Sequence, residues 1–257
     1  MTQLQLVGLL VGLSALLIFA ISQAFLFTSI STGLRPRFRS LPIFGLLRGQ
    51  TGRAIESGRE LHVSIGTGGI SGEDVTTTLA GLQIVEYLAD EAAASGISPI
   101  ITTADATALL LAEDTLRRPY IRQGDLSNYP PLSARLPALS PTPYAAATMD
   151  YLAHENALAN VMSGSFGPEI GLIEHESAKR DLLKVNAAAD PRALAVLTTT
   201  SDHLLIGEEM FAAKAYLQAR PAQLASLRAQ DIVRVAIVVG ILVMFIGSII
   251  RIMVMGS

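Results

Sequence analysis

The stretch LHVSIGTGGISGED, residues 61–74, carries the pattern that decides the predicted fold. A short apolar run, residues 62–65, enters a glycine-rich turn, and the acidic pair Glu73 and Asp74 then opens a helical pattern. Apolar residues recur at helical spacing over residues 74–94, which predicts a helix with one apolar face. A buried strand, a glycine turn and a helix in this order form the basic unit of an α/β fold.

The same order recurs along the middle of the chain. Apolar runs at residues 62–65, 99–103, 160–163 and 194–199 are predicted strands, and each precedes a turn and a helical pattern. The helical patterns include residues 106–118 and 204–217. Strands that alternate with helices favour a parallel sheet covered by helices on both faces.

Three blocks of sequence recur in the same order. Residues 62–69 resemble residues 160–167, residues 101–103 resemble 197–199, and residues 109–114 resemble 204–209. We therefore predict an α/β fold, a Rossmann-like parallel sheet from two β-α-β-α repeats. Between the repeats, residues 126–144 contain five prolines, which predicts an extended connector.

The two ends of the chain are apolar. Residues 4–30 contain no charged side chain, and roughly 20 apolar residues suffice to cross a bilayer. Residues 232–255 form the second candidate span. We expect one longer helix to begin at Pro221 and to continue into this span. A cleaved signal peptide is the alternative for the first span. The long apolar run and the lack of a basic residue before it favour an anchor.

Charge predicts how the chain is oriented. All 22 acidic residues lie between Glu56 and Asp231 together with 12 of the 19 basic residues, which gives this segment a formal charge of −10. Arginines concentrate beside the spans, as cytoplasmic flanks do. We predict a double-pass protein of the cell (inner) membrane with a cytoplasmic central domain and both termini outside. The arginines expected at the membrane interface are Arg35, Arg37, Arg39, Arg48, Arg234 and Arg251.

These patterns predict four segments. Residues 1–30 form a transmembrane helix, residues 31–53 a basic interfacial linker, residues 54–231 a duplicated cytosolic α/β domain and residues 232–257 a second transmembrane helix. The expected partners are the lipid bilayer and a second copy of the chain, or another subunit of a membrane complex. The acidic middle domain argues against nucleic acid, because binding to phosphates requires cations.

The glycine-rich turn is the best candidate for a binding site. Glycines let a backbone approach a ligand closely, and the N–H groups that open a helix attract anions. The spacing differs from Gly-x-Gly-x-x-Gly, and no Walker lysine follows, so a tight turn without a ligand is the alternative. Asp105 is either a ligand contact or, as we favour, a helix N-cap. The candidate ligand-binding residues are Gly66, Thr67, Gly68, Gly69, Ser71, Gly72, Thr103 and Asp105.

Other chemistry finds no support in the sequence. Polar residues 198–202 would line the same sheet edge as Thr103, with Ser201 or Asp202 as a second N-cap. The chain has no cysteine, and its four histidines lack metal-ligand spacing, so we predict no metal site. No nucleophile and base can be paired, so no catalytic residue is predicted. No cofactor is identified, and a nucleotide is the ligand that the glycine turn would suit.

Two sequence blocks resemble a known kind of protein. The blocks at residues 65–69 and 102–105, framed by terminal spans, are similar to those of uncharacterised bacterial two-span membrane proteins with a domain of unknown function. The resemblance implies no activity and no site. We expect a membrane-anchored, non-enzymatic scaffold or sensor that self-associates. The alternatives are a protein or enzyme that binds a nucleotide or small metabolite through the glycine turn, and an accessory subunit of a larger membrane complex.

Overall fold

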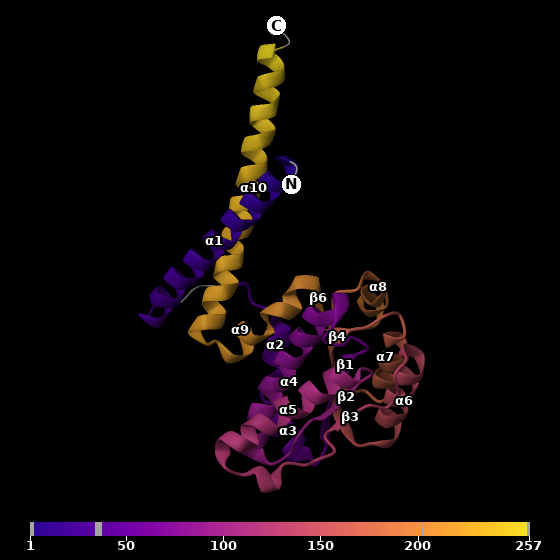
Figure 1. The fold of residues 1–257 in the computed structure, drawn as a ribbon. Coiled ribbons are helices and arrows are strands. Elements are labelled where there is room, and N and C mark those ends of the chain that lie inside the picture. The colour runs from indigo at the N-terminus through magenta and orange to yellow at the C-terminus, as the bar shows by residue number, and fades with distance from the viewer. Residues whose placement is uncertain (1–2, 34–37, 202, 256–257) are drawn as a thin grey trace. The chain divides into compact units, whose positions relative to one another are not determined.

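The computed structural model describes residues 3–33, 38–201 and 203–255 (Figure 1). The chain divides into two compact units. The first unit combines Met1–Arg39 with Ala219–Ser257, and the second unit is Ser40–Gln218.

The first unit contains two long helices, α1 (Gln3–Ser31) and α10 (Pro221–Met255), which pack against each other. The segments Gly12–Ser31 and Pro221–Gly247 are long and apolar enough to cross a membrane. Only 6% of the most apolar window in each is buried, so neither helix is a core helix within this chain. The prediction that one continuous helix begins at Pro221 is confirmed.

The second unit is built on a six-stranded parallel sheet with the order β3-β2-β1-β4-β5-β6. This order is that of the doubly wound Rossmann-like fold, in which the strand order reverses between β1 and β4 although all strands stay parallel. The predicted fold class is therefore confirmed. The strands are β1 (Glu60–Gly66), β2 (Ile100–Thr103), β3 (Ala134–Arg135), β4 (Ala157–Ser165), β5 (Leu183–Ala188) and β6 (Leu204–Ile206).

One face of the sheet is covered by an apolar layer. Val63 and Ile65 of β1 and Val161 of β4 lie in its core and are at most 1% exposed. The elements that supply helical residues to this core are α2 (Pro42–Leu47), α3 (Gln50–Ser57), α4 (Val75–Ser95), α5 (Ala106–Gln123), the 3-10 segment η3 (Gly207–Ala212) and α9 (Ala213–Gln218). Alternate residues of a strand point to the same face, so β1 and β4 supply every second side chain to this layer.

The opposite face carries a smaller apolar core and many buried polar groups. Helices α6 (Pro141–His154), α7 (Ile170–Lys179) and α8 (Pro191–Thr200) cover it, as the right side of the ribbon shows (Figure 1). Their core residues include Tyr144, Ile170 and Leu197. The remaining 3-10 segments are η1 (Gly72–Asp74), which leads into α4, and η2 (Leu126–Asn128), which follows α5.

Several predicted elements are wrong in the second half of the domain. Residues 194–199, predicted as a strand, belong to α8, which has Pro191 in its first turn and Asp190 as its N-cap. The strand in this part of the chain is β5, which comes just before α8 and was not predicted. Its polar residues Lys184 and Asn186 interrupt the apolar pattern of a buried strand. Residues 204–217 form β6, η3 and α9 rather than one helix.

These errors change the predicted repeat. The match of residues 62–69 with 160–167 aligns β1 with β4, which are paired neighbours in the sheet. The other two matches align strand β2 with helix α8 and helix α5 with β6 and η3, so they are wrong. The predicted extended connector at residues 126–144 also contains η2 and β3, and α6 begins within it at Pro141.

Part of the predicted interfacial linker belongs to the α/β unit. Helices α2 and α3 begin at Pro42 and Gln50, inside or across the segment assigned to the linker. Ile43, Phe44 and Leu47 are buried in the core of the sheet domain rather than placed at a lipid boundary. Their apolar spacing is that of a helix with a buried face, and the flanking Arg39 and Arg48 conceal it.

Candidate functional site

The glycine-rich turn lies at the carboxyl end of β1, between the ends of β2 and β4. Gly66 adopts a left-handed φ of +87°, which lets the chain turn out of the strand. The amide of Thr67 donates to the carbonyl of Ser165 at 2.8 Å, and the amide of Ala104 donates to the carbonyl of Gly66 at 2.9 Å. The turn is therefore hydrogen-bonded to both neighbouring chain segments at the point where the strand order reverses.

Three glycines of the turn allow close packing within the chain. A Cβ atom on Gly66 would lie 2.0 Å from the carbonyl oxygen of Ser165. A Cβ on Gly68 would lie 2.7 Å from the side chains of both Asp74 and Ser165, and one on Gly69 would lie 2.6 Å from the carboxylate of Asp105. The space that a glycine loop commonly leaves for a ligand is here taken by the chain's own atoms.

Two carboxylates define the electrostatics of the turn. Asp74 accepts a hydrogen bond from the hydroxyl of Ser165 at 2.5 Å. Asp105 caps α5 and accepts hydrogen bonds from the amides of Thr107 at 2.8 Å and Ala108 at 3.0 Å. The Thr107 side-chain hydrogen bond, more than these backbone bonds, holds the pKa of Asp105 below its usual value, although burial opposes it. Both groups are acceptors that disfavour a bound phosphate.

A chain of hydrogen bonds is buried below this edge, on the sheet face that α6 and α7 cover. The His62 ring lies with Nδ1 2.7 Å from Oδ1 of Asn160 and Nε2 3.0 Å from Oγ1 of Thr102. The Tyr144 hydroxyl is 3.0 Å from Oγ1 of Thr102 and also bonds to Ser64. All five side chains are at most 1% exposed, so each polar group depends on its partners in the network.

Burial sets the protonation of this network. Desolvation lowers the pKa of His62 from 6.5 to about 4; the Asn160 hydrogen bond opposes this shift, and the charge of Arg135 adds to it. Burial also raises the pKa of Tyr144 above its ordinary value. At neutral pH the ring is uncharged and the phenol is protonated, so the network consists of neutral hydrogen bonds.

A second buried polar cluster joins β5 to α7 and α8. Glu174 accepts hydrogen bonds from Asn186 and, at 2.8 Å, from the hydroxyl of Ser201. The ammonium group of Lys184 lies 3.7 Å from the Glu174 carboxylate and donates to the carbonyl of Thr200 at 2.8 Å. Because a buried charge is stable only when it is paired, this cluster fixes the position of α7 against the sheet.

Nearly the whole chain, and not only the glycine-rich turn, matches a known protein family. Residues 3–257 match the family described as "Domain of unknown function (DUF6754)". The chain belongs to this family. No curated protein and no solved structure matches it. The family description assigns no activity, and the geometry of this DUF6754 domain is the evidence for its function.

The DUF6754 domain brings most of the predicted ligand-binding residues together. Thr103 is fully buried, and its hydroxyl donates to the carbonyl of Gly66 at 3.3 Å. Thr67 and Asp105 also lie at this edge, and the N-cap interpretation of Asp105 is confirmed. Ser71 and Gly72 are exposed, and a Cβ on Gly72 would meet no heavy atom within 4 Å. These two residues therefore take no part in the packed turn.

The second polar set predicted for the same edge is placed elsewhere. Thr198, Thr199 and Thr200 lie in α8, and Ser201 follows the carboxyl end of that helix rather than capping a new one. Asp202 lies outside the described residues. Sequence reasoning missed the buried network. Its signal was the pair His62 and Asn160, which occupy matching positions in the one block that aligns β1 with β4.

The predicted interface arginines are only partly described. Arg48 donates through its guanidinium to the carbonyl of Tyr216, which makes it a structural residue of the α/β unit. Arg39 and Arg234 are exposed. Arg35 and Arg37, and the side chain of Arg251, lie outside the described residues. Among residues 3–33, 38–201 and 203–255, no group of three or more His, Cys, Asp or Glu side chains is placed to hold a metal ion.

Proposed function

We propose that this DUF6754 chain is a membrane-anchored, non-enzymatic scaffold or sensor whose α/β domain lies in the cytoplasm. The exposed apolar surface of α1 and α10 supports the anchor. Ile237 and Leu242 of α10, for example, are each 52% exposed. Burying apolar surface is worth about 25 cal/mol per Å², so helices of this length require a bilayer or a protein to cover them.

The packing of the glycine turn carries the non-enzymatic part of the proposal. In a nucleotide-binding Rossmann fold, the turn after the first strand leaves room for a pyrophosphate. In this chain the carboxylate of Asp105 fills the space beside Gly69, and Asp74 with Ser165 fills the space beside Gly68. The edge of the sheet where such folds usually bind a ligand is therefore filled by the chain's own side chains.

The orientation proposal rests on charge and can be tested with cysteines. The chain contains no native cysteine, so one introduced thiol is the sole target of a maleimide reagent. In intact cells we expect a membrane-impermeant maleimide to label Ser257→Cys at the carboxyl terminus and to leave Ser127→Cys unlabelled. Ser127 is exposed on η2, so burial would not protect it.

A matched control separates topology from thiol reactivity. After the cells are opened, Ser127→Cys should react as fully as Ser257→Cys. Labelling of Ser127→Cys in intact cells, with no label at Ser257→Cys, would mean that the central domain lies outside.

We also propose that the chain associates with a second copy of itself. Ala236 and Gly240 of α10, with Ser14 and Ala15 of α1, line an apolar groove of about 540 Å³ within the helical unit. Small residues let another helix backbone approach closely, which supports contact between copies through these helices. A strictly monomeric full-length chain in mild detergent would contradict this part.

Ligand binding at the glycine turn is the second candidate. The sheet topology favours it, because Gly66 lies where the strand order reverses and ligands of open α/β sheets bind at such points. If it is correct, a nucleotide at 100 times its Kd should stabilise the full-length chain by about 2.7 kcal/mol. The measurement is thermal unfolding followed by circular dichroism with a panel of mononucleotides and dinucleotides. No shift with any of them would remove this candidate.

A further inference from the structure

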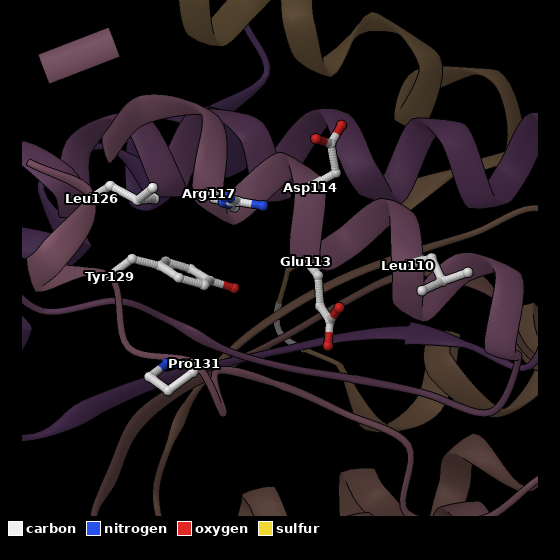
Figure 2. A pocket seen from close by; sticks show the side chains of 7 residues that line it. All are labelled: Leu110, Glu113, Asp114, Arg117, Leu126, Tyr129 and Pro131. Atoms are coloured by element: carbon white, nitrogen blue, oxygen red, sulfur yellow. The ribbon is translucent and has the colours of Figure 1, made fainter. Parts of the chain in front are cut away.

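A cavity of about 530 Å³ lies between α5 and the proline-containing segment that follows it, away from the glycine turn (Figure 2). Cavities of roughly 300–1,000 Å³ are the size that small-molecule sites have. Two turns of α5 form one wall, and η2 with the residues after it forms the other. The residues that line the cavity are Leu110, Glu113, Asp114, Arg117, Leu126, Tyr129 and Pro131.

Two opposite charges in this cavity are not paired with each other. Glu113 and Arg117 are one helical turn apart on α5, a spacing at which such residues commonly form an ion pair. In the part of the chain that the structure describes, neither has an ion pair. Asp114 differs, because it is paired with Arg118. Figure 2 shows the ends of Glu113 and Arg117 on different sides of the hollow, with the Asp114 carboxylate turned away.

Tyr129 holds its hydroxyl group between the charged ends of Glu113 and Arg117 (Figure 2). Its ring packs edge-on against the ring of the buried Tyr120, with the centroids 5.6 Å apart. Its hydroxyl points into the hollow between Glu113 and Arg117 (Figure 2). Burial and the charge of Glu113 raise the pKa of Tyr129, while Arg117 opposes them, so the hydroxyl stays protonated at neutral pH.

The rest of the wall is apolar and accessible. Leu110 is 65% exposed and Leu126 is 42% exposed, although both are large aliphatic residues. Pro131 closes the same side as Tyr129. A ligand with an aliphatic part would remove this apolar surface from water.

We propose that this cavity binds a small zwitterion, an amino acid or dipeptide with an aliphatic side chain. Glu113 would receive the ammonium group, and Arg117 would hold the carboxylate through its planar pair of N–H donors. The Tyr129 hydroxyl would bond to the polar end of the ligand. A ligand of one sign would contact only one of these two charges. This site is separate from the glycine turn, and the inference stands whether or not the chain is a scaffold.

The test is isothermal titration calorimetry of the full-length chain in mild detergent with L-leucine and its dipeptide, at up to about 10 mM. We expect saturable binding of at least one of them. Two analogues that each lack one charge, 3-methylbutylamine and 4-methylpentanoate, should bind about tenfold more weakly, since a hydrogen-bonded charge is lost in each.

Variants assign the binding to the cavity. Glu113→Gln and Arg117→Gln should each weaken binding about tenfold. Arg122→Gln removes a guanidinium on the same helix that does not line the cavity. Its partner Asp90 does not line the cavity either, so the affinity should be unchanged. Circular dichroism of each variant checks that the fold is retained. The proposal is overturned if neither zwitterion binds, if a one-charge analogue binds as tightly as its parent, or if Arg122→Gln weakens binding as much as Arg117→Gln.

Discussion

Replacing Gly81 by alanine is expected to destabilise the α/β domain by about 3 kcal/mol, because α4 and β4 would be forced apart. A Cβ atom on Gly81 would lie 2.1 Å from the backbone carbonyl oxygen of Ser163 and 3.0 Å from its carbonyl carbon. Both neighbours are backbone atoms of a central strand, so no side-chain rotation relieves the overlap. The free energy of unfolding is measured by urea denaturation of the full-length chain, followed by circular dichroism.

A loss of stability in Gly81→Ala would be evidence for the close contact between α4 and β4, because alanine ordinarily stabilises a helix. Within a helix, alanine is more favourable than glycine by about 1 kcal/mol, so the substitution alone would stabilise α4. Gly52→Ala on α3 is the matched control, because Gly52 is exposed and a Cβ there would meet no heavy atom within 4 Å. We expect Gly52→Ala to stabilise the domain by up to about 1 kcal/mol. Equal stabilities for the two variants would contradict the close contact between α4 and β4.

Acidification from pH 6.5 to pH 4 is expected to remove about 3 kcal/mol of stability through His62 alone. Burial holds the pKa of His62 at about 4 in the folded chain, against 6.5 in the unfolded chain. The unfolded chain therefore binds the proton first. The stabilisation is fully present above pH 6.5 and is lost as the pH falls toward 4. The Thr107 hydrogen bond lowers the pKa of the Asp105 carboxyl, so the stability that Asp105 contributes is lost at lower pH than that of His62.

Two histidine variants isolate this contribution. His62→Phe removes the buried titrating ring, so the slope of unfolding free energy against pH between 6.5 and 4 should flatten. The variant should also be less stable at neutral pH, because Asn160 and Thr102 lose a hydrogen-bond partner. His175→Gln is the control, since His175 is exposed and lies outside the buried network, so the slope should be unchanged. A slope in His62→Phe as steep as in the parent chain would show that His62 is not the group responsible.

The buried hydrogen-bond network and the Gly81 contact lie in the same part of the sheet. Both lie at β1 and β4, the two central strands, where the sheet has helices on both faces. A Cβ on Gly164 would lie 1.8 Å from the carbonyl oxygen of Ile65, so the ends of these strands approach each other closely as well. The centre of the sheet is therefore tightly packed, and the cavity beside α5 lies outside it.

The candidate site was predictable in part. Strand β1, its glycine turn and the cap at Asp105 follow from local patterns, because strand, turn and N-cap chemistry depend on residues near in sequence. The filling of the turn by Asp74, Asp105 and Ser165 was not predictable, since Ser165 comes from β4. The cavity beside α5 likewise joins a helix to a proline-containing segment that showed only as an extended connector.

By itself, the sequence determined an α/β domain between two apolar helices, with its first strand, glycine turn and helix correctly placed. Local spacing of apolar residues was sufficient, because helix and strand periodicities act over a few residues. Only the tertiary structure decided that α8 is a helix and β5 a strand, because Lys184 and Asn186 become strand residues once Glu174 of α7 pairs with them. Burial and long-range pairing override local pattern wherever a polar side chain finds its partner on a distant element.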